Sequence, residues 1–157
     1  MVPGINYYKR RVEMFERILY PTDFSDVSKK AINFIKRLKG AGTKEVIVFH
    51  VLDERVIDRI PPHSGINVEG LKRNQKKQAQ EEIRAVADEL KKSGFDVKTR
   101  IDRGIPFREI LKAEQEEDVS VVVIGSHGLG RVEEMLLGSC SEKVIRKSTK
   151  PVLVVRR

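Results

Sequence analysis

Two glycine-containing segments near the end of the chain have residues that are typical of a phosphate site. Gly125-Ser126-His127-Gly128 follows an apolar run, and Gly138-Ser139 comes before a helical pattern. Glycines let the backbone approach a ligand closely, and a glycine and a serine at a helix start expose backbone N–H groups to anions. Together the two segments predict a cradle for a polyphosphate, and the alternative is a pair of ordinary turns.

The spacing excludes three better-known motifs. A Walker loop has a lysine after its last glycine, whereas no lysine follows Gly138. The dinucleotide fingerprint has a third glycine where this chain has Glu133. Ser126 lacks the glycine that stands two residues before the serine of a hydrolase nucleophile elbow.

Three more residues near these segments and strand ends need an interpretation. Asp23 can accept hydrogen bonds from a nucleoside or help to hold a metal ion, or it can complement the start of a helix; the sequence favours neither. His127 has no carboxylate beside it in sequence, which favours a loop residue near the ligand over a general base. Cys140 is interpreted as a small turn residue, with a reactive thiol of lowered pKa as the alternative.

The chain shows no His, Cys and carboxylate cluster with the spacing of metal ligands, so any Mg²⁺ or Mn²⁺ is expected to arrive with phosphates. His50 lies within an apolar run and is interpreted as a packed strand residue.

Five short apolar runs alternate with helical patterns. Three of the runs are nearly continuous and β-branched, as in strands buried on both faces. The alternation predicts a parallel sheet with helices on both sides, and a ligand at the carboxyl ends of the strands. Residues 51–70 break the rhythm and predict a long loop, with a short helix near 55–60. The five runs are 18–20, 46–51, 95–101, 119–124 and 151–155.

The helical patterns have apolar stripes and recognisable ends. Ser25 is expected to cap the first helix, Gly94 to follow the second and Pro106 to open the third. The first stripe is Val27, Ala31, Phe34, Ile35 and Leu38, and the second is Ala79, Ile83, Val86, Ala87 and Leu90.

Length and composition favour one domain. The chain has 157 residues, 39% hydrophobic and 34% charged, and no apolar run of about 20 residues. We expect residues 1–14 to be an N-terminal extension and 15–157 to be the domain. One cysteine and no signal-like segment indicate a cytoplasmic protein. The net charge of +8 is compatible with nucleic acid, but only 6% of residues are aromatic, which disfavours single-strand binding.

These segments resemble the universal stress protein family. Gly125-x2-Gly128-x9-Gly138-Ser139 matches the family's ATP-binding pattern without a gap. The stretches 18–25, 48–51, 104–106 and 150–155 are similar as well, so the resemblance covers about residues 15–157.

The resemblance implies a single three-layer α/β/α domain of Rossmann-like type, with five parallel strands in the order 3-2-1-4-5. It implies a homodimer through the last strand, Val152–Val155. In this family Asp23 and Val51 would hold the adenine and nearby groups, and the glycines the ribose and phosphates. Cys140 stands where the family more often has Val or Ala. The implied ATP-binding residues are Pro21, Thr22, Asp23, Val51, Ile124, Gly125, His127, Gly128, Gly138, Ser139, Cys140 and Ser141.

The leading hypothesis is an ATP-binding switch in a stress response, with slow or no hydrolysis and Mg²⁺ or Mn²⁺ on the phosphates. The first alternative is an ATPase or nucleotidyl-transfer enzyme, against which no acid–base pair is evident; Arg103 and Arg131 are the only arginines near the expected site. The second alternative is a dimeric interaction protein that ignores nucleotide and acts on an unknown partner.

Overall fold

The computed structural model describes residues 15–126 and 137–156. All five strands are parallel and lie in one sheet in the order β3-β2-β1-β4-β5, which confirms the expected fold. Ile18 of the central strand pairs with Val46 on one side and Val121 on the other. The expected extension, residues 1–14, lies outside the described residues. The strands are β1 (Arg17–Pro21), β2 (Glu45–Asp53), β3 (Asp96–Gly104), β4 (Val121–Gly125) and β5 (Val152–Val155).

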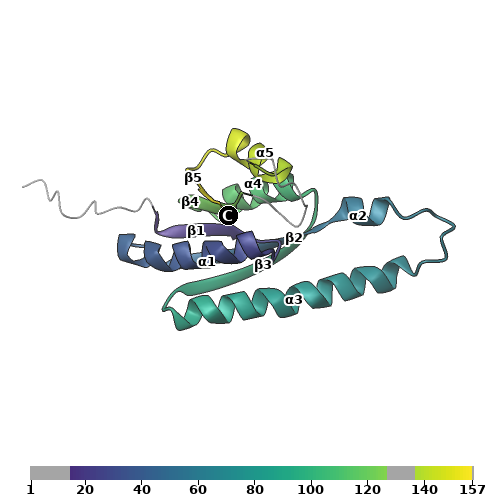
Figure 1. The fold of residues 1–157 in the computed structure, drawn as a ribbon, viewed down its shortest axis with the longest axis horizontal. Coiled ribbons are helices and arrows are strands. Elements are labelled where there is room, and N and C mark those ends of the chain that lie inside the picture. The colour runs from purple at the N-terminus through teal and green to yellow at the C-terminus, as the bar shows by residue number, and fades with distance from the viewer. Residues whose placement is uncertain (1–14, 127–136, 157) are drawn as a thin grey trace, which may run out of the picture.

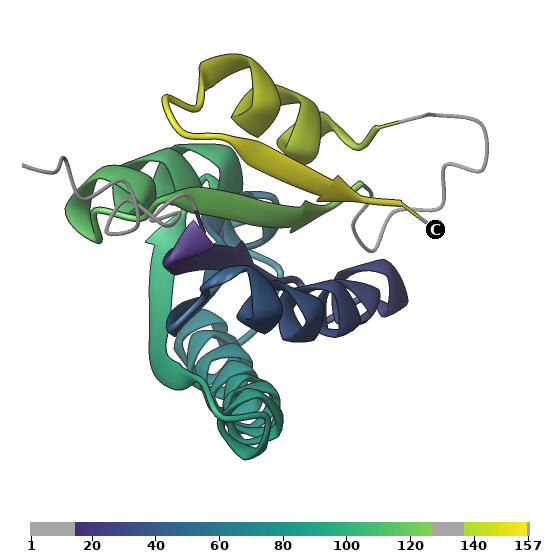
Figure 2. The same cartoon turned by 90° about the vertical axis from the view of Figure 1, so that its left-hand side faces the viewer.

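Helices cover both faces of the sheet. Figure 2 shows α1 (Asp26–Leu38) and α3 (Val68–Lys92) on one side, with α4 (Pro106–Glu116) and α5 (Ser139–Lys147) on the other. A short 3₁₀ turn, η3 (Lys39–Ala41), follows α1, and α2 (Glu54–Asp58) follows β2 directly (Figure 1). None of the helices in residues 15–126 and 137–156 is long and apolar enough to cross a membrane.

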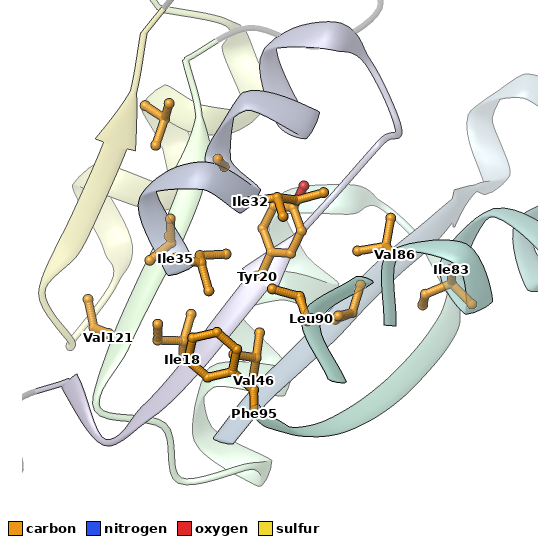
Figure 3. Close-up of a cluster of buried hydrophobic side chains, with 14 residues drawn as sticks. Ile18, Tyr20, Ile32, Ile35, Val46, Ile83, Val86, Leu90, Phe95 and Val121 are labelled. Carbon is orange, nitrogen blue, oxygen red and sulfur yellow. The ribbon is translucent and has the colours of Figure 1, made fainter. Parts of the chain in front are cut away.

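The core beneath α1 and α3 is built around the fully buried Tyr20 (Figure 3). The expected stripe of α3 is confirmed, since all five of its residues are buried. The prediction of the apolar stripe of α1 was wrong at one position, because Phe34 is 46% exposed and Ile32 is buried instead. Successive helical residues are about 100° apart, so Phe34 lies at the border of the stripe, and its ring lies under Arg37 outside the core.

The loop expected over residues 51–70 is shorter than predicted. β2 continues to Asp53, α2 occupies Glu54–Asp58 and α3 begins at Val68. Only residues 68–70 of α3 fall within the expected loop, and the first half of this helix is polar on most sides. Its lysines, glutamines and leucine are nevertheless good helix formers. In Figure 1 this half of α3 and α2 extend beyond the end of the sheet.

Candidate functional site

A cavity of about 750 Å³ opens at the carboxyl ends of β1, β2 and β4, the edge at which the sequence predicts a ligand. His127 and Gly128 lie outside the described residues. All the other expected site residues line this one cavity: Pro21, Thr22, Asp23, Val51, Ile124, Gly125, Gly138, Ser139, Cys140 and Ser141.

The turn from β1 into α1 places Asp23 in the cavity wall. Oδ1 of Asp23 accepts a hydrogen bond of 3.0 Å from the Ser25 N–H, and Ser25 caps α1 at the Ser28 N–H. Between them Phe24 has a φ of 63°, a conformation that is rare for a bulky residue. Asp23 therefore shapes the start of α1 through Oδ1. Its Oδ2 accepts no hydrogen bond from the described residues. The structure is thus compatible with both interpretations of this acid, as a ligand contact and as a helix-start residue.

Thr22 is held from several sides. Its hydroxyl oxygen accepts hydrogen bonds from the Phe24 N–H at 3.0 Å and the Ser28 hydroxyl at 2.8 Å. Below it, the Tyr20 hydroxyl donates to the Ser28 carbonyl at 2.6 Å, and burial raises the pKa of Tyr20. The Thr22 side chain thus supports the turn that carries Asp23.

His50 forms part of the cavity wall, so its interpretation as a packed strand residue was incomplete. Its Nδ1 lies 2.7 Å from the Thr22 carbonyl oxygen. A carbonyl oxygen can only accept a hydrogen bond, so Nδ1 carries the hydrogen of this bond, and Nε2 takes no part in it. The ring stacks on Phe24 with centroids 4.6 Å apart. Together His50 and Phe24 make an aromatic surface at the ends of β1 and β2.

The start of α5 fits an anion. Gly138 is the N-cap residue and provides no side-chain cap, while its own N–H donates to the Ser126 carbonyl at 2.7 Å. The first N–H groups of a helix have no partner within the helix, and here they belong to Ser139, Cys140 and Ser141, which line the cavity. Such uncapped N–H groups, with the positive end of the helix dipole, are suited to phosphate.

The two described glycines of the predicted cradle have different structural roles. A Cβ on Gly125 would lie 3.4 Å from the backbone of Ser28, so a glycine there lets the end of β4 pack closely on α1. Gly138 has φ −72° and ψ 154°, which any residue can adopt. Only its lack of a side chain, beside the first N–H groups of α5, relates it to a ligand.

Comparison with known proteins gives the family. The sequence model described as "Universal stress protein family" matches residues 14–156. The chain belongs to the universal stress protein family. It is 42% identical over 156 residues to universal stress protein MJ0577 of Methanocaldococcus jannaschii, covering 92% of this chain and 96% of that protein. It is 32% identical to universal stress protein YxiE of Bacillus subtilis, covering 91% of this chain and all of that protein.

Solved structures agree in fold. The structure of MJ0577 superposes with a TM-score of 0.84 over 92% of this chain and 97% of that one. More distant structures, at 23% and 20% identity with TM-scores of 0.63, are a universal stress protein in complex with cAMP and one from Archaeoglobus fulgidus in complex with dAMP. Both matches cover 90% of this chain. They cover 97% of the chain in the cAMP complex and 98% of the chain in the dAMP complex. These two show a shared fold.

In this universal stress protein Cys140 is not an activated thiol. Burial raises its pKa to about 11, although the charge of Arg55 acts in the opposite direction. The alternative of a lowered pKa was therefore wrong, because loss of hydration on burial outweighs the charge of the nearby Arg55.

Sequence reasoning missed the residues that α2 and α3 bring to the cavity. Arg55 of α2 lines it, whereas Arg103 does not and Arg131 lies outside the described residues. Gln75 and Glu82 line it from α3, and Oε1 of Gln75 is buried without a hydrogen-bond partner among the described residues. The only local signal was the position of Arg55 just after β2. The described residues contain no group of three or more possible metal ligands.

Proposed function

We propose that this universal stress protein binds ATP in the cavity, within a domain of residues 15–157, and acts as a nucleotide-dependent switch in a stress response with slow or no hydrolysis. One observation carries the proposal: the uncapped start of α5 lines the same cavity as Asp23 and Val51. The phosphates would bind the first N–H groups of α5, and the base would lie toward the ends of β1 and β2. The ligands named in the cAMP and dAMP complexes belong to this class of nucleotide.

The hydrogen bonding of His50, in the cavity wall, favours a switch over an enzyme. His50 bonds to the Thr22 carbonyl through Nδ1, and no hydrogen bond joins its ring to a carboxylate among the described residues. A general base is normally oriented by such a partner. The site therefore offers binding groups in the described part of the wall, and Mg²⁺ or Mn²⁺ would be carried by the phosphates.

The two edges of the sheet suggest how copies associate. Arg100 of the β3 edge pairs with Asp102, Glu116 and Glu117, so this edge is charged. The β5 edge is the apolar Val152–Val155. Charged side chains on an edge strand disfavour its pairing with a strand of another chain, whereas an apolar edge strand favours such pairing. We propose a cytoplasmic homodimer through β5, with a further protein partner in place of nucleic acid or membrane.

The test is the nucleotide content of the purified protein, followed by calorimetric titration with ATP and Mg²⁺. Bound adenine nucleotide or a saturable heat is expected. Absence of both would contradict ATP binding and favour the nucleotide-independent dimer. Phosphate release at enzyme-like rates would favour the ATPase alternative.

A further inference from the structure

Arg55 is held in the cavity wall by a two-pronged pair with Asp53. Nε of Arg55 lies 2.8 Å from Oδ1 of Asp53, and Nη2 lies 2.5 Å from Oδ2. Both residues line the cavity that contains the first turn of α5. Arg55 and Cys140, the latter in the first turn of α5, both line this cavity. Burial raises the pKa of the Cys140 thiol, and the charge of Arg55 acts in the opposite direction.

The pair is not needed to build α2. Asp53 already caps this helix by accepting the Arg55 N–H at 3.1 Å, a bond that any side chain at position 55 would leave in place. The Arg55 and Asp53 side chains are 49% and 27% exposed, and pairs so exposed contribute little to stability. Asp53 thus holds the Arg55 guanidinium at the cavity, although the pair adds little to the stability of the fold.

A guanidinium can exchange a carboxylate for a phosphate without changing its geometry. Both anions accept two parallel N–H bonds from the same fork, and a phosphate carries more charge. Lysine has no such fork, so the exchange is specific to arginine.

We propose that Arg55 binds the outer phosphates of the nucleotide and makes the site select polyphosphate nucleotides over monophosphates. The inference rests on the proposed ATP binding and adds the residue that distinguishes nucleotides by their number of phosphates. In the free protein Asp53 holds the guanidinium; with ATP bound, the phosphates held at the start of α5 replace it.

The test compares ATP, ADP and AMP affinities by calorimetry with Mg²⁺ present. Arg55→Ala should weaken ATP by about tenfold or more, as expected for loss of a charge-assisted pair, and leave AMP within about twofold of wild type. Arg59→Ala is the matched control, because it removes the same charge from the end of α2 at an exposed position that does not line the cavity. It should change neither affinity.

A double variant separates binding from mere neutralisation of Asp53. Asp53→Asn keeps a residue suited to cap α2 and removes the carboxylate that Arg55→Ala would leave unpaired. In Asp53→Asn/Arg55→Ala, ATP should remain weak. Wild-type ATP affinity in this double variant would overturn the proposal, since Arg55 would then only mask Asp53.

The remaining outcomes are also decisive. If wild type binds ATP and Arg55→Ala binds it equally well, or loses ATP and AMP affinity to the same extent, the role of Arg55 is wrong and ATP binding stands. If wild type binds none of the three nucleotides, the proposed function falls and the role of Arg55 falls with it. Equal thermal midpoints of all variants would show that the comparison concerns folded protein.

Discussion

The side-chain hydroxyl of Ser141, in the first turn of α5, donates a buried hydrogen bond of 2.8 Å to the backbone carbonyl of Gly125 at the end of β4. A second bond runs from the Gly138 N–H to the Ser126 carbonyl at 2.7 Å. Together they fix the start of α5 against the strand end from which the glycine segment departs. The position of the proposed phosphate site thus depends on tertiary hydrogen bonds as well as on glycine spacing.

Ser141→Ala should therefore destabilise the fold. It leaves the buried Gly125 carbonyl without this donor, at a cost of about 1–3 kcal/mol in the free energy of unfolding. Urea denaturation measures the change. Ser139→Ala, two residues earlier and exposed, is the control and should change stability by less than about 0.5 kcal/mol. Equal stability of wild type and Ser141→Ala would show that α5 is anchored by other contacts.

Gly138→Val should abolish ATP binding while the protein still folds. The backbone at Gly138 has φ −72° and ψ 154°, which valine adopts readily, so the cost to stability should be at most about 1 kcal/mol. The branched side chain would occupy the space beside the first N–H groups of α5. Calorimetry measures the affinity and circular dichroism the fold.

The control for this substitution is Gly40→Val in η3, where an added Cβ meets nothing within 4 Å. It should bind ATP as wild type does. Wild-type affinity in Gly138→Val itself would mean that this glycine only forms a turn.

Glu117 should contribute stability that acid removes. Its carboxylate, 8% exposed, bonds Lys98 at 2.5 Å and Arg100 at 3.1 Å, and these bonds hold its pKa below its ordinary value of 4.5. A carboxyl with a lowered folded-state pKa stabilises the fold above its unfolded-state pKa. This stabilisation is lost as pH falls from 4.5 through the lower folded-state pKa.

The measurement is urea unfolding of wild type and Glu117→Gln from neutral to acidic pH. The stability difference between the two should be largest near pH 7, since only wild type carries the charge, and should shrink below pH 4.5. Glu81→Gln, at an exposed position of α3, should track wild type throughout. A difference that is constant with pH would show that the Glu117 charge is not what stabilises.

Val154→Lys should convert the proposed dimer to monomer. A charge on the apolar β5 edge opposes pairing of two such edges. Sedimentation measures the association state, and circular dichroism checks that the variant folds. Thr99→Lys adds the same charge to the exposed β3 edge and should leave the dimer intact. A wild type that sediments as a monomer would refute the β5 dimer.

Much of the local structure could be predicted because its signals involve neighbouring residues. Ser25 caps α1 as expected, Gly94 follows α3 with a φ of 86°, and Pro106 is the first residue of α4. Each depends on the geometry of one or two turns of chain. The side on which an apolar stripe is buried is less local, and so Phe34 was placed inside and Ile32 was not.

The sequence by itself determined the alternation of strands and helices, the edge of the sheet at which to look, and, through the glycine spacing, the resemblance to one family. Periodicity could not order the strands, because hydrophobic patterns do not say which strands pair. Only the tertiary structure brought His50, Arg55 and Gln75 into one cavity wall. Their meeting depends on how α3 packs on β2 and β3 and how α2 packs beside β3. That packing is the sum of many contacts between residues far apart in the chain.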